Sequence, residues 1–246
     1  MTQLTGKVAL VTGGGRGIGP VIARRLADEG AQIIVSYANS RAGADKVVSD
    51  IKGSGGKASA AQADLRHRSD ILRLFEQIDR EVDRLDILIN CAGISGTSPL
   101  LGPVDEEMVE TLIGVNLRAP FYLAAEAAKR MPSGGRIVNF STTVAHFPFA
   151  GGSIYAGAKA AVECFTKVWA KELGAKGITV NTVVPGATSP GMMDNAPEHR
   201  PFFEKASPFG RIGRAEEVAA VVAFLCSPEA SWVSGTDIMV NGAGSA

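Results

Sequence analysis

The stretch VALVTGGGRGIG, residues 8–19, joins a short apolar run to a cluster of glycines. A helical pattern follows from about Pro20 to Glu29, and this order is typical of a buried strand that turns sharply into a helix. The free N–H groups and positive dipole end of such a helix favour a phosphate, which glycines allow to approach the backbone. The spacing T-G-x-x-x-G-x-G differs from the G-x-G-x-x-G of dinucleotide-binding folds, so a tight turn without a ligand is the alternative.

The composition describes a charge-balanced globular chain. Its 246 residues are 46% hydrophobic with a formal net charge of zero, which predicts one large α/β domain. No basic run indicates nucleic acid or an anionic membrane surface as a partner. The chain opens without a signal-peptide pattern, and its longest apolar run, Val218–Cys226, is far shorter than the ~20 residues of a membrane-spanning helix, so we expect a cytoplasmic protein. Three scattered cysteines (Cys91, Cys164, Cys226) predict buried thiols and no metal site.

Strand-like apolar runs alternate with amphipathic helical stretches along most of the chain. This alternation predicts a parallel sheet covered by helices on both faces, in a single doubly wound, Rossmann-like α/β domain. The expected strands are residues 7–11, 32–36, 57–61, 86–90, 136–140, 179–184 and 237–240. The expected helices are residues 20–29, 42–54, 69–84, 105–131, 153–175 and 215–225.

Residues 186–211 interrupt this alternation with four prolines and several apolar side chains. An insertion of this length in a compact domain is usually functional or mobile. Its apolar residues predict a lid over a pocket, and a surface loop pinned by a few aromatic rings is the alternative. These residues are Met192, Met193, Phe202, Phe203 and Phe209.

Small polar residues and glycines recur where the expected strands end. Ligands of parallel sheets bind at the carboxyl ends of the strands, so this repetition predicts a cofactor site. After the glycine turn, the strand ends carry Tyr37, Asn39 and Ser40; Asp64 and Leu65; Asn90, Cys91, Ala92 and Gly93; Ser141, Thr142 and Thr143; and Pro185 and Gly186.

The end of the second strand lacks a carboxylate, which would bond the ribose hydroxyls of the cofactor and repel a 2′-phosphate. The next acidic residue is Asp45, inside the expected helix. Asn39, Ser40 and Arg41 occupy the strand end instead, and Arg16 projects from the glycine turn. Two guanidinium groups suit a phosphate monoester, so we expect NADP(H) rather than NAD(H). The alternative is that both arginines are merely solvated.

Tyr155 and Lys159 open a long expected helix, and their four-residue spacing puts both side chains on one face. A nearby ammonium favours a phenolate, so we expect the pKa of Tyr155 to fall from ~10 toward neutrality. Such a tyrosine can give a proton to a carbonyl oxygen or take one from an alcohol. An isolated pair of this kind is more often structural, so the interpretation depends on its context.

With these pieces in place, the chain resembles the short-chain dehydrogenase/reductase family. The matching motifs occur in family order and at family spacing, over residues 7–242. They are residues 12–19, Asp64, Asn90–Gly93, Asn116, Tyr155-x-x-x-Lys159 and Pro185–Gly186. The resemblance implies a doubly wound sheet with the strand order 3-2-1-4-5-6-7.

The resemblance also implies roles for individual residues. Tyr155 would be the acid/base, Lys159 would lower its pKa and bind the nicotinamide ribose, and Asn116 would kink its helix and hold a relay water. Asp64 and Leu65 would flank the adenine, and Pro185 and Gly186 would lie along the nicotinamide. The other expected cofactor contacts are Gly13, Arg16, Gly17, Ile18, Gly19, Tyr37, Asn39, Ser40, Asn90, Ala92 and Gly93.

Two positions depart from the family pattern. The family's substrate-binding serine usually lies thirteen positions before the tyrosine, where this chain has Thr142. Ser141 lies fourteen positions before, as the serine does in some members that reduce polycyclic aromatic ketones. Threonine keeps the hydroxyl, and the ungapped run Gly135–Asn139 points to it, so we expect Thr142 to bond the substrate oxygen, with Ser141 as the alternative. The hydroxyl that bonds the nicotinamide carboxamide is Thr188 or Ser189, a choice that stays open.

The expected reaction is reversible hydride transfer between NADP(H) and a ketone or secondary alcohol. The expected pocket is largely apolar and favours an aryl or medium-chain ketone. His146 is expected as a wall of this pocket rather than as a catalyst. The expected lining is Ile94, Ser95, His146, Phe147, Phe149, Met192 and Met193.

Three other functions are compatible with parts of the sequence. A 3-oxoacyl carrier-protein reductase, the branch that the chain is similar to, would need a basic surface near the pocket, and Arg118, Lys129 and Arg130 belong to a helix away from it. A catalytically idle NADP-binding redox sensor is disfavoured by the intact Tyr155 and Lys159. A nucleotide-sugar epimerase or dehydratase would have a shorter glycine spacing and an added domain.

Apolar residues lie on more than one face of the expected helices 105–131 and 153–175. That exceeds what one face of a sheet requires, so we expect helix pairing across a two-fold axis. Family members are commonly tetramers, and we expect a homotetramer here.

Overall fold

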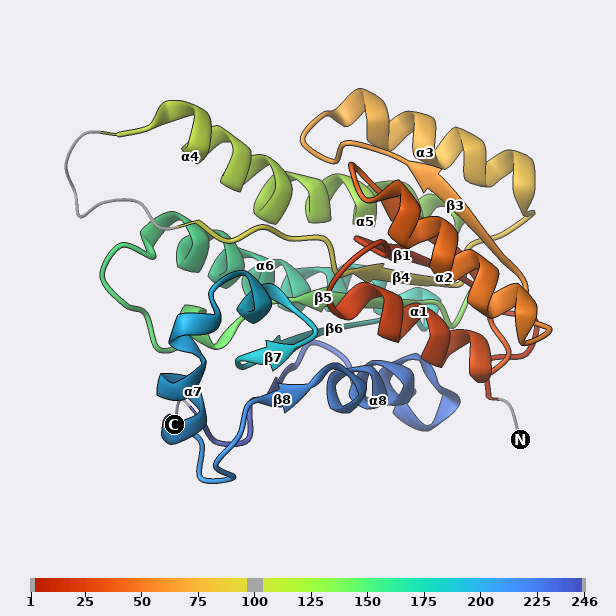
Figure 1. The fold of residues 1–246 in the computed structure, drawn as a ribbon. Coiled ribbons are helices and arrows are strands. Elements are labelled where there is room, and N and C mark those ends of the chain that lie inside the picture. The colour runs from red at the N-terminus through yellow and green to blue at the C-terminus, as the bar shows by residue number, and fades with distance from the viewer. Residues whose placement is uncertain (1–2, 97–103, 245–246) are drawn as a thin grey trace.

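The computed structural model describes residues 3–96 and 104–244. Seven parallel strands form one sheet in the order β3-β2-β1-β4-β5-β6-β9, which confirms the order that the resemblance implies (Figure 1). The order reverses between β1 and β4, and this switch point is where sheets of this class bind ligands. The strands are β1 (Val8–Thr12), β2 (Gln32–Tyr37), β3 (Ala58–Gln62), β4 (Ile87–Asn90), β5 (Arg136–Phe140), β6 (Thr179–Pro185) and β9 (Asp237–Val240).

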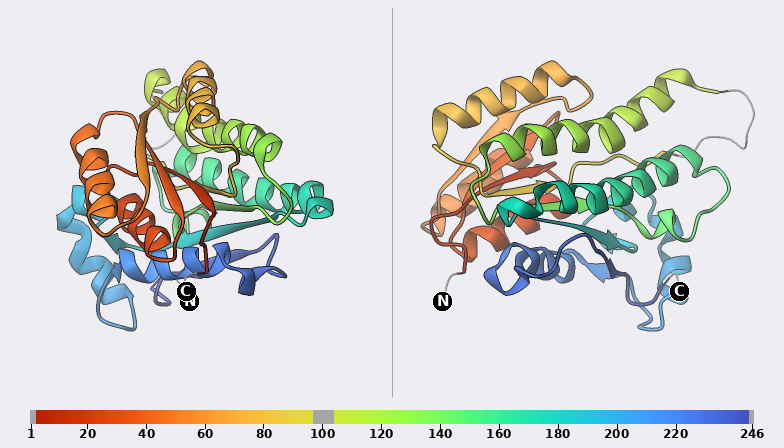
Figure 2. Two further views of the ribbon diagram at one scale, coloured as in Figure 1. Left: turned by 90° about the vertical axis from the view of Figure 1, so that its right-hand side faces the viewer. Right: turned by 180° about the vertical axis from the view of Figure 1, so that it is seen from behind.

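Helices cover both faces of this sheet. One face packs against α1 (Ile18–Asp28), α2 (Arg41–Gly53) and α8 (Ala215–Cys226). The other packs against α3 (Arg68–Glu81), α5 (Ala119–Arg130) and α6 (Ser153–Leu173), of which α5 and α6 lie side by side in the view from behind (Figure 2). In the described part of the chain, no helix combines the length and apolarity needed to cross a membrane.

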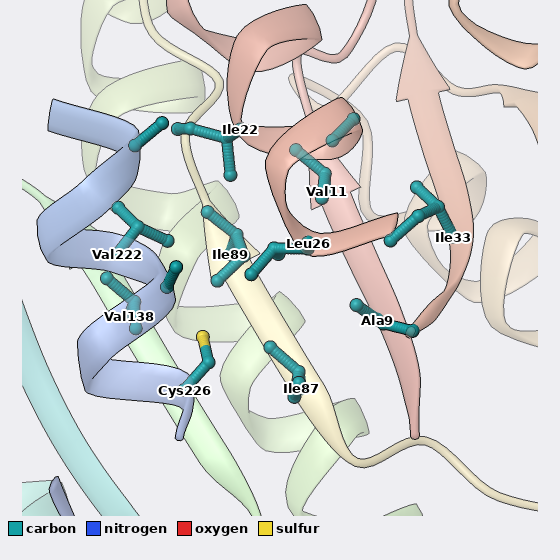
Figure 3. Packing of buried hydrophobic residues seen from close by; sticks show 14 of the residues in the cluster. Ala9, Val11, Ile22, Leu26, Ile33, Ile87, Ile89, Val138, Val222 and Cys226 are labelled. Carbon is teal, nitrogen blue, oxygen red and sulfur yellow. The ribbon is translucent and has the colours of Figure 1, made fainter. Parts of the chain in front are cut away.

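The inner strands β1, β4, β5 and β6 are buried on both faces, which is why most of them are nearly continuous apolar runs in the sequence. On one face, Ala9 and Val11 of β1 pack with Ile22 and Leu26 of α1 (Figure 3). Leu10, between them in sequence, packs into the cluster on the opposite face. Full burial of an aliphatic side chain contributes ~1.5–3 kcal/mol relative to exposure, so these two clusters hold the glycine turn between β1 and α1 in a fixed place.

The expected single helix over residues 105–131 is wrong in one respect. Helix α4 (Glu106–Ile113) passes into a π-helical turn, Gly114–Arg118, before α5 begins. Asn116 lies in this wider turn with its side chain fully buried. Its Oδ1 accepts from the Ile94 N–H at 3.2 Å and its Nδ2 donates to the Ile94 carbonyl at 2.9 Å. The amide thus serves both backbone groups of one residue after β4, and π-turns of this kind are frequent at functional sites.

The expected lid, residues 186–211, is more ordered than an irregular loop. Strand β7 (Thr188–Ser189) pairs in parallel with β8 (Gly213–Arg214). Between them lie the 3₁₀ turns η4 (Met192–Asn195) and η5 (Pro197–His199) and the helix α7 (Arg200–Ala206). After α7, the Ser207 hydroxyl donates to the Gly242 carbonyl at 3.3 Å. Figure 1 shows β7, α7 and β8 grouped near the C-terminus, so the segment is anchored at both of its ends.

Candidate functional site

Close packing explains most of the glycines between β1 and α1. A Cβ on Gly13 would lie 2.9 Å from the Ala92 Cα, and one on Gly19 would lie 2.3 Å from the Gly13 carbonyl oxygen. Gly17 differs, because its φ is +61° and the nearest atom to an added Cβ is the Gly191 Cα of the lid, at 3.5 Å. Gly17 therefore faces the lid rather than the body of the fold.

Gly17 is also the residue that precedes α1, and no side chain caps this helix end. The first N–H groups of α1 therefore remain available to a phosphate. The first turn of α2 packs directly on the glycine turn, because a Cβ on Gly43 would lie only 2.0 Å from the Gly15 carbonyl oxygen. This contact brings Arg41, at the start of α2, against the turn that carries the exposed Arg16.

The second-strand end presents polar groups of different exposure. Tyr37 is buried, whereas Asn39 and Arg41 are exposed. Arg41 is engaged, since its Nε lies 3.5 Å from the Asp45 carboxylate. The hydroxyl of Ser36 is buried and has no hydrogen-bond partner in the described part of the chain.

Asn90 offers a second buried acceptor at the end of β4. Its Nδ2 donates to the Asn139 Oδ1 at 2.8 Å, while its own Oδ1 has no partner among the described residues. Buried polar atoms without partners are rare, and an unpaired acceptor at a strand end fits the hydroxyl of a ribose. The donor set around the glycine turn and these strand ends thus fits a phosphorylated dinucleotide.

Thr12 belongs to the matching motif of residues 12–19, but no role was expected for its side chain. Its hydroxyl donates to the Ile89 carbonyl at 3.2 Å and accepts from the Ala92 N–H at 3.0 Å. These two bonds tie the end of β1 to the end of β4, the two strands on either side of the switch point. Its only signal in the sequence was a hydroxyl at the last position of an apolar strand.

Asp64 and Leu65 follow β3 as expected, but the Asp64 carboxylate is already paired. The Arg66 guanidinium donates to both of its oxygens, and this hydrogen bonding holds the pKa of Asp64 below its ordinary value. Leu65 is buried. Asp64 is therefore charged at neutral pH and has its orientation fixed by a neighbour.

Tyr155, Lys159 and Glu163 are spaced at successive turns of α6 and are all buried. The Lys159 Nζ donates to the Phe140 carbonyl at 2.8 Å, and burial lowers the pKa of this lysine to about 8. A Cβ on Gly93 would lie 3.2 Å from the Asn116 Oδ1 and 3.5 Å from the Lys159 Nζ. The side chains of Asn116 and Lys159 thus converge on the segment after β4.

The expected fall in the pKa of Tyr155 is wrong for this structure. Burial raises the pKa of Tyr155 above its ordinary value, and a hydrogen bond with Thr142 opposes that rise. The ammonium of Lys159 faces the Phe140 carbonyl, so it does not offset the loss of water around the phenol. Four-residue spacing places two side chains on one helix face, but it does not fix where the end of a long lysine points.

The structure separates the two neighbouring hydroxyls at the end of β5. The Ser141 Oγ donates to the Glu163 Oε1 at 2.5 Å, whereas the Thr142 hydroxyl lies on the side of Tyr155, where it opposes the rise that burial causes in the pKa of that tyrosine. Successive residues of an extended backbone point to opposite sides, so only one of the two can face Tyr155. The geometry favours Thr142 as the group that would bond a substrate oxygen.

A buried polar chain fixes α6 against the sheet. The Asn139 Nδ2 of β5 donates to the Thr166 Oγ1 at 2.8 Å, and Thr166 is 2.7 Å from the Thr182 hydroxyl of β6. Together with the bond from Asn90 to Asn139, this chain crosses the three neighbouring strands β4, β5 and β6. Satisfied buried networks specify a unique packing, so the height of Tyr155 above the sheet is set partly by these side chains.

The lid brings Met192 onto Tyr155. The Tyr155 hydroxyl donates to the Met192 Sδ at 3.8 Å, and a Cβ on Gly93 would lie 3.3 Å from the Met192 Cε. Phe147 and Phe149, expected to line the pocket, are about half exposed, at 47% and 52%.

The choice between Thr188 and Ser189 is narrowed by the lid's own hydrogen bonds. The Ser189 hydroxyl donates to the Asp194 carboxylate at 2.7 Å, a contact within the lid. Thr188 is buried beside the sheet end, with its hydroxyl 3.0 Å from the Gly186 carbonyl oxygen. The arrangement favours Thr188 as the hydroxyl next to Pro185 and Gly186.

Comparisons with known proteins agree with this geometry. Residues 13–244 match the protein family described as "Enoyl-(Acyl carrier protein) reductase". The chain is 40% identical to the short chain dehydrogenase/reductase AacuN of Aspergillus aculeatus, over 97% of this chain and 96% of the relative. It is 38% identical to the hydroxynaphthalene reductase-like protein Arp2 of Metarhizium robertsii, over 98% of this chain and 95% of the relative.

Among solved structures, the angucycline C-6 ketoreductase LanV with bound NADP superimposes with a TM-score of 0.93 at 36% identity. The match covers 98% of this chain and 96% of that one. Sequence identity and fold therefore agree over almost the whole length. The chain belongs to the short-chain dehydrogenase/reductase family.

Proposed function

We propose that this protein is an NADPH-dependent ketoreductase that reduces an aryl or other apolar ketone to a secondary alcohol. The observation that carries the proposal is that the Thr142 hydroxyl lies near enough to Tyr155 to oppose the rise that burial causes in the pKa of that tyrosine, with the buried Lys159 one helical turn further along α6. Two hydroxyls that meet at one point can both bond a single carbonyl oxygen. Donors aimed at a developing oxyanion are commonly the largest contribution to such catalysis.

Each residue then has a defined task in the reducing direction. The bound cofactor supplies a hydride. Tyr155 donates its proton to the carbonyl oxygen, and Thr142 donates a hydrogen bond to the charge that develops there. Lys159, whose pKa is about 8, is charged at neutral pH and lies one helical turn from Tyr155, with its Nζ held by the Phe140 carbonyl. Asn116 holds the segment after β4 in place beside Lys159.

The preference for NADPH rests on the surroundings of the glycine turn. Arg16 is exposed on that turn, and the start of α2 with Arg41 packs against it. Guanidinium groups bind phosphate monoesters through charge-assisted hydrogen bonds, so the two arginines suit a 2′-phosphate. The NADP bound by LanV supports the same preference.

The apolar surroundings of Tyr155 support an apolar substrate. Met192 covers the tyrosine hydroxyl, and Phe147 and Phe149 follow Thr142 on the same connection. Flat aromatic substrates pack well on thioethers and rings. The descriptions of Arp2 as hydroxynaphthalene reductase-like and of LanV as a ketoreductase point in the same direction.

An acyl thioester on a carrier protein is the second candidate substrate, because the description of the matching family names an acyl carrier protein. NADPH oxidation should therefore be followed with a fused-ring aryl ketone, a medium-chain aliphatic ketone, a 3-oxoacyl thioester and an enoyl thioester. We expect turnover with the ketones, abolished in Tyr155→Phe. Turnover with a thioester alone would favour the carrier-protein substrate. Tight NADPH binding without turnover of any compound would favour a redox sensor.

A further inference from the structure

The connection from β5 to α6 is held by one buried carboxylate. The Glu163 Oε1 accepts a hydrogen bond from the Ser141 Oγ at 2.5 Å and lies 2.9 Å from the His146 Nε2. Ser141 directly follows β5, and His146 directly follows the 3₁₀ turn η2 (Thr143–Ala145). We propose that Glu163 is a positioning residue that clamps both ends of the segment 141–146 and so holds the Thr142 hydroxyl against Tyr155.

The clamp determines which way Thr142 points. Ser141 is turned toward α6 by Glu163, and the extended backbone of Thr142, with φ −159° and ψ 151°, places its side chain on the other side. The Thr142 Oγ1 already accepts from the Val144 N–H at 3.3 Å. Its own proton is therefore free to point away from the turn, toward Tyr155 or a substrate oxygen.

The same three residues do not form a nucleophilic triad. Both Ser141 and His146 contact the same oxygen of Glu163, so the histidine is not aligned to take a proton from the serine. Ser141 is buried, which also keeps its hydroxyl from a substrate. The arrangement suits holding a segment in place rather than a second reaction.

The two lysines nearest to Glu163 on α6 make their hydrogen bonds and ion pairs with other groups. Lys159, one turn earlier on α6, directs its Nζ to the Phe140 carbonyl. Lys167, one turn later, pairs with Asp237 at 2.6 Å. Burying a carboxylate costs free energy unless it is hydrogen-bonded, and here the bonds come from the segment that carries Thr142. Residues at successive turns of α6 thus have different roles. Tyr155 and Lys159 belong to the proposed reaction centre, and Glu163 positions the segment that carries Thr142.

The test compares Glu163→Ala, Glu163→Gln and His146→Ala with Glu172→Ala, an exposed glutamate on the same helix. The clamp proposal rests on the proposed function. The kcat is therefore measured with the ketone from the substrate panel above that the wild type reduces best. We expect Glu163→Ala to lower kcat by ~10²-fold, since misplacing one reacting group by about 1 Å has effects of this size. The KM for NADPH should change by less than ~2-fold, because the contacts of Glu163 are with Ser141 and His146 and not with the glycine turn. Glu163→Gln keeps an acceptor oxygen and should restore kcat to within ~5-fold of the wild type, whereas Glu172→Ala should match it.

A second measurement does not need turnover. Each variant is titrated by its tyrosine absorbance, and the same variant carrying Tyr155→Phe in addition is titrated in parallel. The difference between the two titrations gives the pKa of Tyr155. Met192, which contacts the phenol, and Lys159, one turn further along α6, are unchanged in all variants. Losing the clamp should raise this pKa, because the opposing hydrogen bond from Thr142 is lost. Thermal unfolding reports whether each variant is folded.

Three outcomes would overturn the clamp. One is full kcat in Glu163→Ala, and another is an equal loss in Glu163→Gln and Glu163→Ala. The third is a loss of kcat that parallels loss of NADPH affinity and melting temperature, which would show a role in stability alone. If the wild type reduces no ketone, the proposed function fails, whereas the titration of Tyr155 still decides whether Glu163 positions Thr142.

Discussion

The Met192 sulfur accepts a hydrogen bond from the Tyr155 hydroxyl over 3.8 Å, although the two residues belong to the lid and to α6. A ketone that takes the proton of Tyr155 has to occupy the place of this sulfur. We therefore expect the η4 turn to shift when substrate binds, while β7 and Ser207 keep the ends of the segment attached. This expectation couples substrate binding to the position of residues 186–211 through one side chain, that of Met192.

Met192→Ala is expected to raise the KM for an apolar ketone by ~10-fold and to change kcat by less than ~3-fold. Two effects oppose each other, because the variant removes a competing acceptor but also removes apolar contact with the bound ketone. The contact should dominate, since a bond to sulfur is weak and full burial of a methionine contributes ~1.5–3 kcal/mol. Steady-state kinetics measure both constants, with Met192→Leu as the control that keeps the volume. An unchanged KM in Met192→Ala would contradict this role.

Thr142→Ala is expected to lower kcat by ~10²-fold or more, because an aimed hydrogen bond to the transition state is lost. Thr142→Ser keeps the hydroxyl and should retain most of the activity. Ser141→Ala should cost less than ~10-fold, since the His146 contact still holds Glu163 to the segment. Ketone reduction under saturating NADPH measures all three. If Ser141→Ala were the more damaging change, the hydroxyls would have the opposite roles.

The double change Arg16→Ala with Arg41→Ala is expected to reduce the NADPH/NADH ratio of kcat/KM by ~10²-fold, since hydrogen bonds to a charged group contribute ~1.5–3 kcal/mol each. The value for NADH should hardly move. Arg16→Ala alone should account for most of the effect, because Arg41 is partly engaged with Asp45. Arg73→Ala, at an exposed position of α3, is the matched control. An unchanged ratio in the double variant would refute the assignment to NADPH.

The buried Lys159 should leave a signature in the pH dependence of stability. Its folded pKa of about 8 lies below the ordinary 10.5, so the folded chain releases this proton at lower pH than the unfolded chain does. The cost of burying the charge is fully present below pH 8 and is relieved as the pH rises toward 10.5. Lys159→Met should therefore be more stable than the wild type at pH 7, by an amount that shrinks as the pH approaches ~9.5.

Urea unfolding at several pH values measures this difference, with Lys171→Met as the control, since Lys171 is an exposed lysine of the same helix. A stability difference that stays constant with pH would mean that Lys159 does not titrate in this range. The comparison is kept below the ordinary pKa of tyrosine, ~10, so that Tyr155 does not contribute.

We propose a homotetramer, and light scattering at micromolar concentration should detect it. Phe121 of α5 and Val168 of α6 are 45% and 44% exposed, and the Phe121 ring contacts the rings of Phe165 and Trp169. Covering this apolar surface favours pairing of the two helices across a symmetry axis. Phe121→Glu with Val168→Glu should give smaller species, whereas Leu72→Glu, at an exposed position of α3, should not. A monomeric wild type would overturn the proposal.

The sheet could be predicted almost completely from the sequence, because strands buried on both faces leave continuous apolar runs. The expected and observed bounds of β5 and β9 coincide, and the others shift by one residue or so. The resemblance implied a kink at Asn116, but its π-helical form could not be predicted, since it depends on hydrogen bonds to Ile94, 22 residues away in the sequence. The π-turn is stabilised by this tertiary contact and not by the helix propensity of its residues.

The sequence indicated which residues lie near one another in the candidate site, but it did not indicate the direction of the Tyr155 pKa shift. Motif spacing brought Tyr155, Lys159 and Thr142 together, yet the direction of the Tyr155 pKa shift depends on burial and on where the Lys159 ammonium points. Glu163 was missed for a related reason. A glutamate two turns after Tyr155 on a helix gives no sign, in sequence alone, that its partners lie on the preceding connection.

The contact of Gly43 with the Gly15 carbonyl has a consequence for protein engineering. A graft of residues 37–41 from an NAD-selective relative would replace Arg41 but not Arg16, and would leave the point where α2 touches the glycine turn unchanged. Any donor segment that carries a side chain at position 43 would push the two turns apart, since a Cβ there would be 2.0 Å from the oxygen. Successful exchange of cofactor preference should therefore keep glycine at position 43, whether or not the graft extends that far.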